Sequence, residues 1–397
     1  MAVTTSWDPF DRALHVDPYD VWKTLRDHAP VYRNDEYDFY ALTRYQDVLD
    51  ASLDTATYSS AHGITIDTIT PEPWPPPAMM IMTDPPQHTP MRKMVNRTFT
   101  PRRMNQLTDR VRSLCDGYLD PFVGAGSMDY VTDFSMKLPV MVISSMLGFP
   151  EEDHDQLRRW SDAALHRDEG RPEANEHSQQ SMANLLAYYA DQVAQRRREP
   201  RDDMLSDLMA TEIVELDGTT RLLDDGEAVA YMALINVAGN ETVARLLGWA
   251  ALTLAEHPEQ RALLVEDPSL TPNAVDELLR YDAPSPVQGR WTTRAVMVHG
   301  VEIPAGSKVA LVTGSAGRDE RQYRNPDRFD VLRPNLHHVS FGHGAHYCLG
   351  AALARLEGRI ALEETLARFP DWHAERDMVE WVHTSTVRGP ASVPITY

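Results

Sequence analysis

The sequence predicts a mainly α-helical protein with small β-sheets, folded as one domain over residues 1–397. Three observations carry this prediction. Long stretches place apolar residues at helical spacing, apolar–polar alternation is confined to short segments, and no linker, low-complexity tract or internal repeat divides the chain. Length alone would suggest two or three domains, but no change in composition marks a boundary.

In the N-terminal half, proline and polar turns mark the element boundaries. A helix over 18–28 has Pro18 in its first turn, and two short strands over 31–33 and 39–42 flank a polar turn. From 61 to 82 the prolines are too dense for a helix or a strand ladder, so we expect a long loop that walls or covers a ligand pocket. Further helices are predicted over 44–53, 86–99, 101–124, 133–147, 151–167 and 182–198.

One long helix dominates the C-terminal half. It is predicted to begin at a cap formed by Asp224 or Asp225 and to end near Glu256, a length on the order of 45 Å. It is apolar on nearly every side, as expected of a central helix. Thr271 and Pro272 open the next helix as its cap and first residue. The remaining predictions are strands over 296–301 and 308–313 with a turn at 303–306 between them, a helix over 349–369 and a hairpin over 381–395.

Composition excludes several classes of function. The chain has 38 Lys and Arg against 59 Asp and Glu, a formal net charge of −21, which argues against general nucleic-acid binding. The two cysteines, Cys115 and Cys348, do not form a disulfide framework, which suits a reducing compartment. Residues 1–11 do not resemble a signal peptide, and the longest apolar stretch, 228–239, is shorter than the ~18 residues that a membrane span needs. We therefore expect a soluble, cytoplasmic protein.

The clearest chemical signal lies in residues 341–350, which read Phe-Gly-His-Gly-Ala-His-Tyr-Cys-Leu-Gly. Three glycines flank Cys348 just before a predicted helix. The unpaired amides of a helix N-terminus favour a thiolate over a thiol, and glycines let the backbone approach a flat or bulky group. A thiolate presented in this way is a soft ligand for a metal ion.

Two other interpretations of this cysteine remain open. A lone cysteine is usually a small buried hydrophobe, which we favour for Cys115 but which leaves the glycines around Cys348 unexplained. A zinc site is the second alternative, because four histidines crowd the same region, His337, His338, His343 and His346. Structural zinc sites generally use four converging ligands with more than one cysteine, and only one cysteine is present here.

The pattern Phe-Gly-x-Gly-x-His-x-Cys-x-Gly resembles the haem-binding loop of the cytochrome P450 family, the haem-thiolate monooxygenases. All six fixed positions match, namely Phe341, Gly342, Gly344, His346, Cys348 and Gly350. The resemblance implies that Cys348 is the axial ligand of the haem iron, where a thiolate favours O–O cleavage. It also implies the fold of that family, with the haem between the long central helix and the cysteine loop.

Other segments resemble the same family in the expected order. His88 and Arg92 lie at i and i+4, as in the family's segment that contacts the haem propionates, and the resemblance assigns Arg290 and His346 to the same role. A central helix that contains Ala-Gly-Asn-Glu-Thr at 238–242 resembles the family's oxygen-binding groove. This implies that Gly239 makes room over the haem and that Glu241 and Thr242 relay protons to dioxygen. The alternative is a satisfied structural kink, because polar groups in an apolar helix are costly unless they are used or paired.

Glu277 and Arg280 share one helix face at i and i+3, which by itself usually indicates a weak surface ion pair. The spacing resembles the Glu-x-x-Arg signature of the family, which implies an interior pair completed by a further arginine. That role is assigned to Arg328. Val287 and the turn at 384–386 are weaker candidates for contacts with a bound ligand.

The resemblance implies a bacterial, more narrowly actinobacterial, monooxygenase with haem b (iron protoporphyrin IX) as cofactor and dioxygen as co-substrate. Such an enzyme hydroxylates or epoxidises a hydrophobic small molecule, for example a secondary metabolite, terpenoid or lipid. Electrons are expected from a ferredoxin and its ferredoxin reductase, which would dock near Cys348 on a face with four arginines, Arg102, Arg103, Arg355 and Arg359. We expect a monomer with no nucleic-acid or membrane partner.

Two alternatives to this function stay open. One is a haem-thiolate enzyme of another kind, driven by peroxide or coupling phenols. The other is a non-enzymatic haem-binding sensor or carrier, which would need neither a proton relay nor a docking face.

Overall fold

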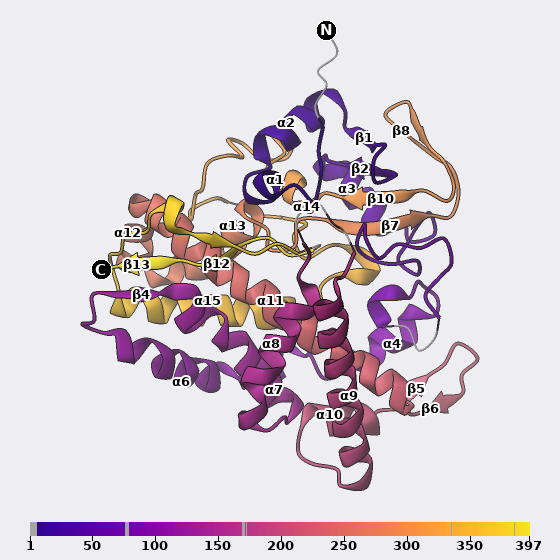
Figure 1. Cartoon of the computed structure of the whole chain (residues 1–397), viewed down its shortest axis with the longest axis horizontal. Coiled ribbons are helices and arrows are strands. Elements are labelled where there is room, and N and C mark those ends of the chain that lie inside the picture. The colour runs from indigo at the N-terminus through magenta and orange to yellow at the C-terminus, as the bar shows by residue number, and fades with distance from the viewer. Residues whose placement is uncertain (1–5, 76–78, 169–170, 172, 335, 385) are drawn as a thin grey trace.

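The computed structural model describes residues 6–75, 79–168, 171, 173–334, 336–384 and 386–397. Helices make up most of it (Figure 1). The α-helices are α1 Arg12–Val16, α2 Tyr19–His28, α3 Tyr45–Leu53, α4 His88–Val95, α5 Pro101–Asn105, α6 Thr108–Leu119, α7 Lys137–Leu147, α8 His154–Leu165, α9 Glu176–Arg198, α10 Met204–Ala210, α11 Asp225–Glu256, α12 Pro258–Glu266, α13 Thr271–Tyr281, α14 Thr313–Ala316 and α15 Ala351–Arg368. Short 3₁₀ turns are η1 Met80–Met82, η2 Asp120–Phe122, η4 Glu151–Asp153, η5 Pro268–Leu270, η6 Gly344–His346 and η7 Arg376–Met378, and η3 Val131–Ser135 is a π turn.

The strands form one five-stranded sheet and several two-stranded pairs. They are β1 Val31–Asn34, β2 Phe39–Leu42, β3 Tyr58–Ser59, β4 Ser127–Asp129, β5 Ile213–Val214, β6 Thr220–Arg221, β7 Gln288–Thr292, β8 Val296–Val298, β9 Val301–Ile303, β10 Lys308–Leu311, β11 Glu380–Trp381, β12 Pro390–Ser392 and β13 Pro394–Thr396. The large sheet has the order β1-β2-β10-β7-β3, and β10 is parallel to β2 and antiparallel to β7. Figure 1 places this sheet with α1, α2 and α3 at one end of the molecule, and the longer helices fill the rest.

Helix α11 runs through the middle of the helical body. Its start is fixed by a capping box, in which the Asp224 carboxylate accepts the Glu227 N–H at 2.8 Å and the Glu227 carboxylate accepts the Asp224 N–H at 3.0 Å. The helix is buried over most of its length because α7, α8, α9 and α15 all pack against it. Both the predicted central helix and its predicted cap are confirmed.

Several predicted boundaries differ from the structure. The range 101–124 contains two helices, α5 and α6, and the range 133–147 begins with the π turn η3. Helix α9 begins at Glu176, earlier than predicted, because the Asn175 side chain accepts the Ser178 N–H at 2.9 Å and caps it. Helix α13 is preceded by Leu270, so Thr271 is its first residue and not its cap.

The strand pairing after α13 also corrects the prediction. The range 296–301 was expected to pair with 308–313, but β8 pairs with β9, with Val296 opposite Ile303. The reason is a tight turn directly after β8, where His299 and Gly300 have φ values of 49° and 79°. Strand β10 instead joins the large sheet beside β7, a strand that was not predicted. The C-terminal hairpin is confirmed by the pairing of β11 with β12.

A buried ion-pair network ties α13 to the segment after α14. Arg280 Nε lies 2.7 Å from Glu277 Oε2, and both side chains are fully buried. The further arginine is Arg333, whose Nε lies 3.1 Å from the same carboxylate, so the assignment of this role to Arg328 is wrong. Arg328 contributes only its main-chain carbonyl, which accepts from Arg333 at 2.6 Å and from Arg280 at 3.2 Å. A fully buried carboxylate needs this density of cationic donors to remain ionised.

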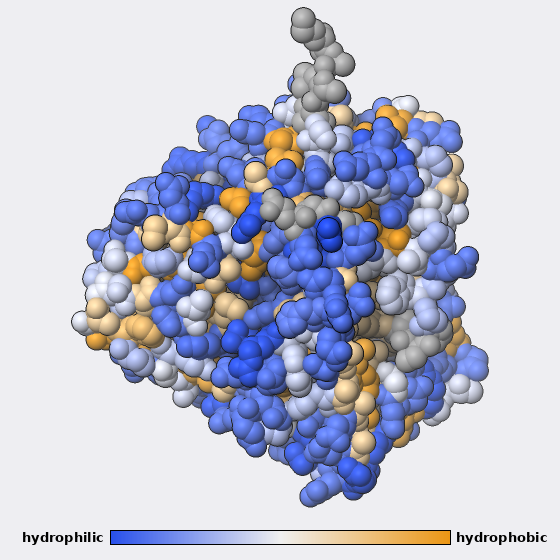
Figure 2. Space-filling model, in the orientation of Figure 1, coloured by the Kyte–Doolittle hydropathy of each residue, from blue (hydrophilic) through white to orange (hydrophobic). Residues whose placement is uncertain are grey.

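The face seen in Figure 2 is mostly hydrophilic, with apolar residues in scattered patches. This agrees with the formal net charge of −21. In the part of the chain that the structure describes, no helix combines the length and the apolar character that a bilayer crossing requires.

Candidate active site

The loop that carries Cys348 is shaped by glycines. Gly342 and Gly344 have φ values of 67° and 70°, a region that residues with a side chain rarely adopt. At Gly344 a Cβ would also lie 3.0 Å from the carbonyl oxygen of Ser52. The Cys348 N–H donates to the Phe341 carbonyl at 2.8 Å, so the loop closes on itself just before α15 begins at Ala351. The predicted arrangement of a glycine-bent loop and a helix start is confirmed.

The electrostatics of Cys348 differ from the sequence-based expectation. Burial raises the pKa of this thiol, and it outweighs the backbone N–H near Gly350 and the positive charges of Arg92 and Arg355, which act in the opposite direction. The protein alone therefore does not hold a thiolate here. A bound metal ion would, because coordination deprotonates a thiol.

Four basic side chains gather on one side of this loop. They come from α4, β7 and η6, and they are His88, Arg92, Arg290 and His346. The imidazole rings of His88 and His346 lie 4.5 Å apart between centroids. Burial, together with the neighbouring guanidinium groups, lowers the pKa of His88 to about 4 and that of His346 to about 3. Asp84 is the acidic group near this cluster, and its carboxylate lies 4.0 Å from His346 Nε2.

Two histidine nitrogens of this cluster lack acceptors. His88 Nε2 and His346 Nε2 are buried and have no hydrogen-bond partner among the described residues. The Arg290 guanidinium donates to the carbonyl of its own neighbour Gly289 at 2.6 Å, and burial lowers the pKa of Arg290 to about 10. Buried donors without acceptors are costly, so this cluster fits an anionic group. A haem carries two carboxylates and an iron ion, so the residues present fit such a group: the cluster would hold the carboxylates and Cys348 the iron.

Helix α11 contributes a partly open stripe. Leu234, Ala238 and Thr242 lie at i, i+4 and i+8, and Ala238 is exposed although it sits in the middle of a largely buried helix. The Thr242 hydroxyl donates to the Ala238 carbonyl at 2.9 Å. Arg92 on α4 connects the two sides of the site, because its charge acts both on Cys348 and on Tyr231 of α11. The hydroxyl of Thr242 is therefore held on the side of α11 that is open.

Gly239 lies where α11 crosses α7. A Cβ at this position would meet Ile143 Cδ1 of α7 at 1.9 Å, whereas real Cβ contacts essentially never fall below 3.0 Å, so Ile143 would have to move. The glycine therefore allows a close approach of α11 and α7. That it also makes room over the haem stays a prediction.

Glu241 points away from Thr242 into a charged cluster. One carboxylate oxygen, Oε1, accepts from Arg245 Nη2 at 2.8 Å and from Arg245 Nε at 3.2 Å. Arg245 also donates to the Pro390 carbonyl at 2.6 Å, which fixes it against β12. Arg245 was not predicted as a site residue, although its i+4 spacing from Glu241 indicates that the two side chains share a helix face.

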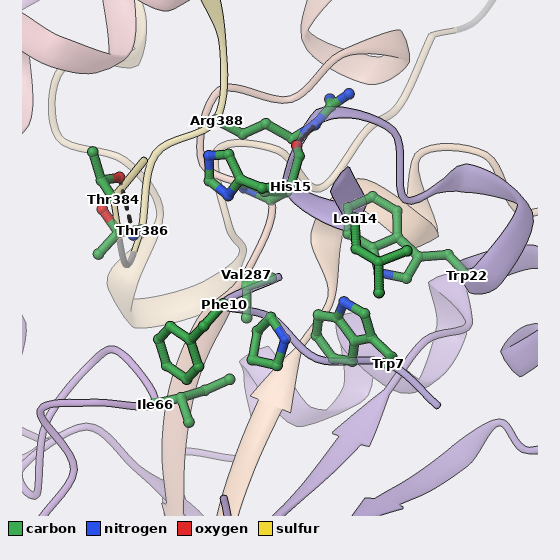
Figure 3. A pocket seen from close by; sticks show the side chains of 12 residues that line it. Trp7, Phe10, Leu14, His15, Trp22, Ile66, Val287, Thr384, Thr386 and Arg388 are labelled. Carbon is green, nitrogen blue, oxygen red and sulfur yellow. Dashed lines mark hydrogen bonds between the residues drawn. The ribbon is translucent and has the colours of Figure 1, made fainter. Parts of the chain in front are cut away.

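The weaker pocket candidates line a small cavity. Figure 3 shows Val287, Thr384 and Thr386 around a space of about 40 Å³, with Trp7 and Phe10 on the opposite side. That volume suits a water molecule or two and not an organic substrate. Residue 385, within the predicted turn, lies outside the described residues. The loop 61–82 packs nearby, since its Ile64 carbonyl accepts the Gly289 N–H at 2.6 Å.

Three of the four arginines expected to attract a redox partner already have acidic neighbours. Arg103 lies 2.8 Å from Asp207, Arg355 lies 2.8 Å from Asp276, and Arg359 lies 3.0 Å from Glu363. Arg102 is exposed. The positive field of this face is therefore weaker than the sequence indicates.

The zinc alternative finds no ligand set. Within the described ranges, no group of three or more His, Cys, Asp or Glu side chains is placed to hold a metal ion. His338 instead lies 3.2 Å from Asp276, and the ring of His346 faces His88.

Known proteins resemble this chain over nearly its whole length. A family model described as Cytochrome P450 matches residues 264–380. A protein of Mycobacterium tuberculosis named putative cytochrome P450 123 is 40% identical over 392 residues, which covers 98% of this chain and 96% of that protein. The vitamin D(3) 25-hydroxylase of Pseudonocardia autotrophica is 38% identical over 406 residues, covering 100% and 98%. The erythromycin C-12 hydroxylase of Saccharopolyspora erythraea is 39% identical over 360 residues, covering 89% and 87%.

The fold agrees with these sequence relatives. The solved structure of a cytochrome P450 from Chondromyces apiculatus has a TM-score of 0.88 to this chain at 33% sequence identity, and the match covers 99% of this chain and 98% of that one.

Proposed function

The chain belongs to the cytochrome P450 family and is a haem-iron monooxygenase that uses dioxygen, and from this membership we propose that its cofactor is haem b, bound through Cys348. The bound cofactor supplies the oxygen and one-electron chemistry. The observation that carries the proposal is the set of buried donors without acceptors, His88 Nε2 and His346 Nε2, beside the cysteine loop. Phe341 and Gly342 belong to the proposed binding site because they shape that loop.

The proposed contacts to the haem carboxylates come from His88, Arg92, Arg290 and His346. Arg290 is buried on β7 with a lowered pKa, and an anion beside it would offset the cost of that burial. Arginine suits this role because its planar fork matches a carboxylate.

We propose Glu241 and Thr242 as the residues that supply protons during oxygen activation. Thr242 offers a hydroxyl on the open stripe of α11, where its orientation is held by the Ala238 carbonyl. Glu241 offers a carboxylate with one unpartnered oxygen. We propose that Gly239 makes room over the haem as well as allowing the close packing of α11 against Ile143.

The proposed substrate is a hydrophobic small molecule, which the enzyme hydroxylates or epoxidises. Support comes from the names of two relatives, one of which hydroxylates vitamin D(3) and the other erythromycin. The secondary metabolite, terpenoid and lipid classes are therefore the first to test.

The proposed electron donor is a ferredoxin with its reductase. It would approach the face near Cys348, with exposed Arg102 as its first charged contact, and the ion-paired state of the neighbouring arginines favours weak, transient docking. We also propose that the chain acts in the cytoplasm as a monomer with a single domain.

The test is turnover by the haem-loaded protein after a spectral screen for compounds that displace the iron-bound water. With ferredoxin and reductase, the wild type should form product in proportion to the electrons consumed, and Thr242→Ala should consume electrons with far less product. Full-rate turnover with peroxide alone would instead favour the peroxide-driven alternative. No product from any bound compound, with Thr242→Ala indistinguishable from the wild type, would favour the sensor.

A further inference from the structure

An open cavity of about 500 Å³ lies on the outer side of Glu241, distinct from the cation cluster and from the cysteine loop. Its walls come from α8 and the residues after it, from α11, from β11 and β12, and from the segment between those two strands. It is large enough to hold many water molecules. It therefore gives solvent a way to approach a carboxylate that is only 4% exposed.

Only one of the two carboxylate oxygens of Glu241 accepts hydrogen bonds from the described residues. Arg245 occupies Oε1, while Oε2 is buried and has no hydrogen-bond partner among the described residues. The side chains of both partners are nearly inaccessible, with 3% and 2% exposed. A buried carboxylate oxygen without a donor is costly, so a proton or a donor is expected at this position.

Asp162 of α8 is the neighbouring acid. It lines the same cavity, and its side chain is 31% exposed there. Burial and the nearby charge of Glu241 raise the pKa of Asp162 to about 7, against the lowering effects of Arg245 and Arg158. Two carboxylates this close do not both ionise readily. Asp162, whose pKa is raised to about 7, is therefore the member of the pair that can hold a proton near neutral pH.

Of the other charged groups around this pair, Arg158 contacts Asp162 itself, whereas Arg167, His166 and His383 have other partners. Arg158 Nη1 lies 3.1 Å from Asp162 Oδ2, Arg167 pairs with Asp67, and His166 lies 3.6 Å from Asp168. His383 bonds to the carbonyls of Arg167 and Phe10. Arg12 lines the cavity from α1. Asp162 is thus the titratable group placed both at the cavity and at Glu241.

We propose that Asp162 and Glu241 form a proton-sharing carboxyl–carboxylate pair that carries protons from the water of this cavity into α11. In each transfer the O–H bond of Asp162 breaks as an O–H bond forms on Glu241, a proton from the solvent in the cavity restores Asp162, and Glu241 releases its proton in the supply role proposed above before it accepts another. No electron or other reactant is required. This inference rests on the proposed role of Glu241 in proton supply, and it adds the residue that feeds it.

The test compares Asp162→Asn with Asp155→Asn in the haem-loaded enzyme. Asparagine keeps the shape and can still donate to Glu241, but it carries no transferable proton. Asp155 is a matched control, since it lies on the same helix and 4.0 Å from Arg158 but is 80% exposed. The first readout does not depend on turnover and follows the carboxyl stretching bands by infrared spectroscopy as pH is varied.

Two carboxyl groups are expected to titrate near neutral pH in the wild type and in Asp155→Asn, that of Asp162 near pH 7 and that of buried Glu357 near pH 8, and only the second should remain in Asp162→Asn. The inference is overturned if the band near pH 7 is missing from the wild type or if it persists in Asp162→Asn. The second readout is product formation, which should fall about tenfold or more in Asp162→Asn with a larger solvent isotope effect, while substrate binding and the first reduction stay unchanged. The wild-type rate should decline as pH rises through about 7, and this limb should be lost in Asp162→Asn.

A third variant, Glu241→Gln, distinguishes failure of the Asp162 inference from failure of the proposed role of Glu241. If Glu241→Gln impairs product formation and Asp162→Asn does not, proton supply through Glu241 stands and the Asp162 inference fails. If both variants retain the wild-type rate and isotope effect, the proposed role of Glu241 fails as well, whereas haem binding through Cys348 is untouched.

Discussion

The packing of Gly239 against Ile143 gives a prediction that can be worked out quantitatively. In Gly239→Ala the new Cβ would lie 1.9 Å from Ile143 Cδ1, so the isoleucine must move or the helices must separate. Overpacking of this kind costs about 1–3 kcal/mol. Alanine in place of glycine inside a helix returns about 1 kcal/mol. The single variant should therefore lose roughly 0–2 kcal/mol of stability.

A second substitution should reverse this loss. Ile143→Val removes the clashing Cδ1 and alone costs about 0.5–1.5 kcal/mol. In the double variant the next atom, Ile143 Cγ1, is 3.4 Å from the new Cβ, an ordinary contact. The new methyl then fills the space that valine leaves, so the double variant should lie within about 1 kcal/mol of the wild type. The coupling energy between the two positions is thus about 2 kcal/mol in favour of the pair.

The assay is urea unfolding of the four haem-loaded proteins, followed by circular dichroism, together with the spectrum of the carbonyl complex. Additive losses in the double variant would refute the packing argument. A perturbed carbonyl spectrum in Gly239→Ala that Ile143→Val does not relieve would support the interpretation that this glycine makes room over the haem.

Three further predictions follow from buried groups elsewhere. Arg333→Ala should lose about 3–5 kcal/mol of unfolding free energy, because the buried Glu277 carboxylate loses a cationic partner. Arg328→Ala should stay within about 0.5 kcal/mol of the wild type, because only the main chain of Arg328 makes hydrogen bonds in this network. Equal urea midpoints for the two variants would contradict this prediction. Arg290→Gln should release haem to an acceptor protein at least about tenfold faster than the wild type, a difference of about 1.4 kcal/mol, because Arg290 is buried at the proposed carboxylate contact. The control is Arg294→Gln, which should release haem at the wild-type rate because the Arg294 side chain is 67% exposed. Identical release rates in the two variants would count against the carboxylate contact. Burial, followed by the charges of Arg388 and His383, lowers the pKa of His15 to about 3. Below about pH 6.5 the unfolded chain therefore binds a proton at His15 that the folded chain does not bind, and the stability of the fold decreases as pH falls from about 6.5 toward 3. His15→Gln should therefore lose about 1–2 kcal/mol less than the wild type between pH 7 and 5, and parallel losses would show that His15 does not contribute.

The parts of the structure that the sequence predicts are those fixed by local chemistry. Asp224 and Glu227 specify the start of α11 within four residues, and the glycines at 342 and 344 specify the loop before Cys348 by their backbone conformation. The spacing of His88 and Arg92 places both on one face of α4. In each case the determining contacts lie within a few residues of one another, so the pattern is complete in the sequence.

The parts that it does not predict depend on contacts between distant segments. Arg328 and Arg333 both lie in an arginine-rich stretch, and only the folded chain decides which of them reaches Glu277. The close contact between Gly239 and α7 follows from the crossing of the two helices, which brings Ile143 to Gly239 from almost 100 residues away in the sequence. Asp162 is 79 residues from Glu241, and no spacing rule connects them. The tight turn at His299 and Gly300 pairs β8 with β9, and the periodicity of the strand residues alone did not predict this pairing.

The most direct measurement is the absorption spectrum of the reduced carbonyl complex after reconstitution with haemin, compared among the wild type, Cys348→Ser and Cys115→Ser. Cys115 is fully buried in the core and serves as the control for losing a sulfur atom. We expect the spectrum of thiolate ligation in the wild type and in Cys115→Ser, and its loss in Cys348→Ser. A wild type that binds no haem, or a Cys348→Ser protein that keeps the thiolate spectrum, would contradict the assignment of the iron ligand.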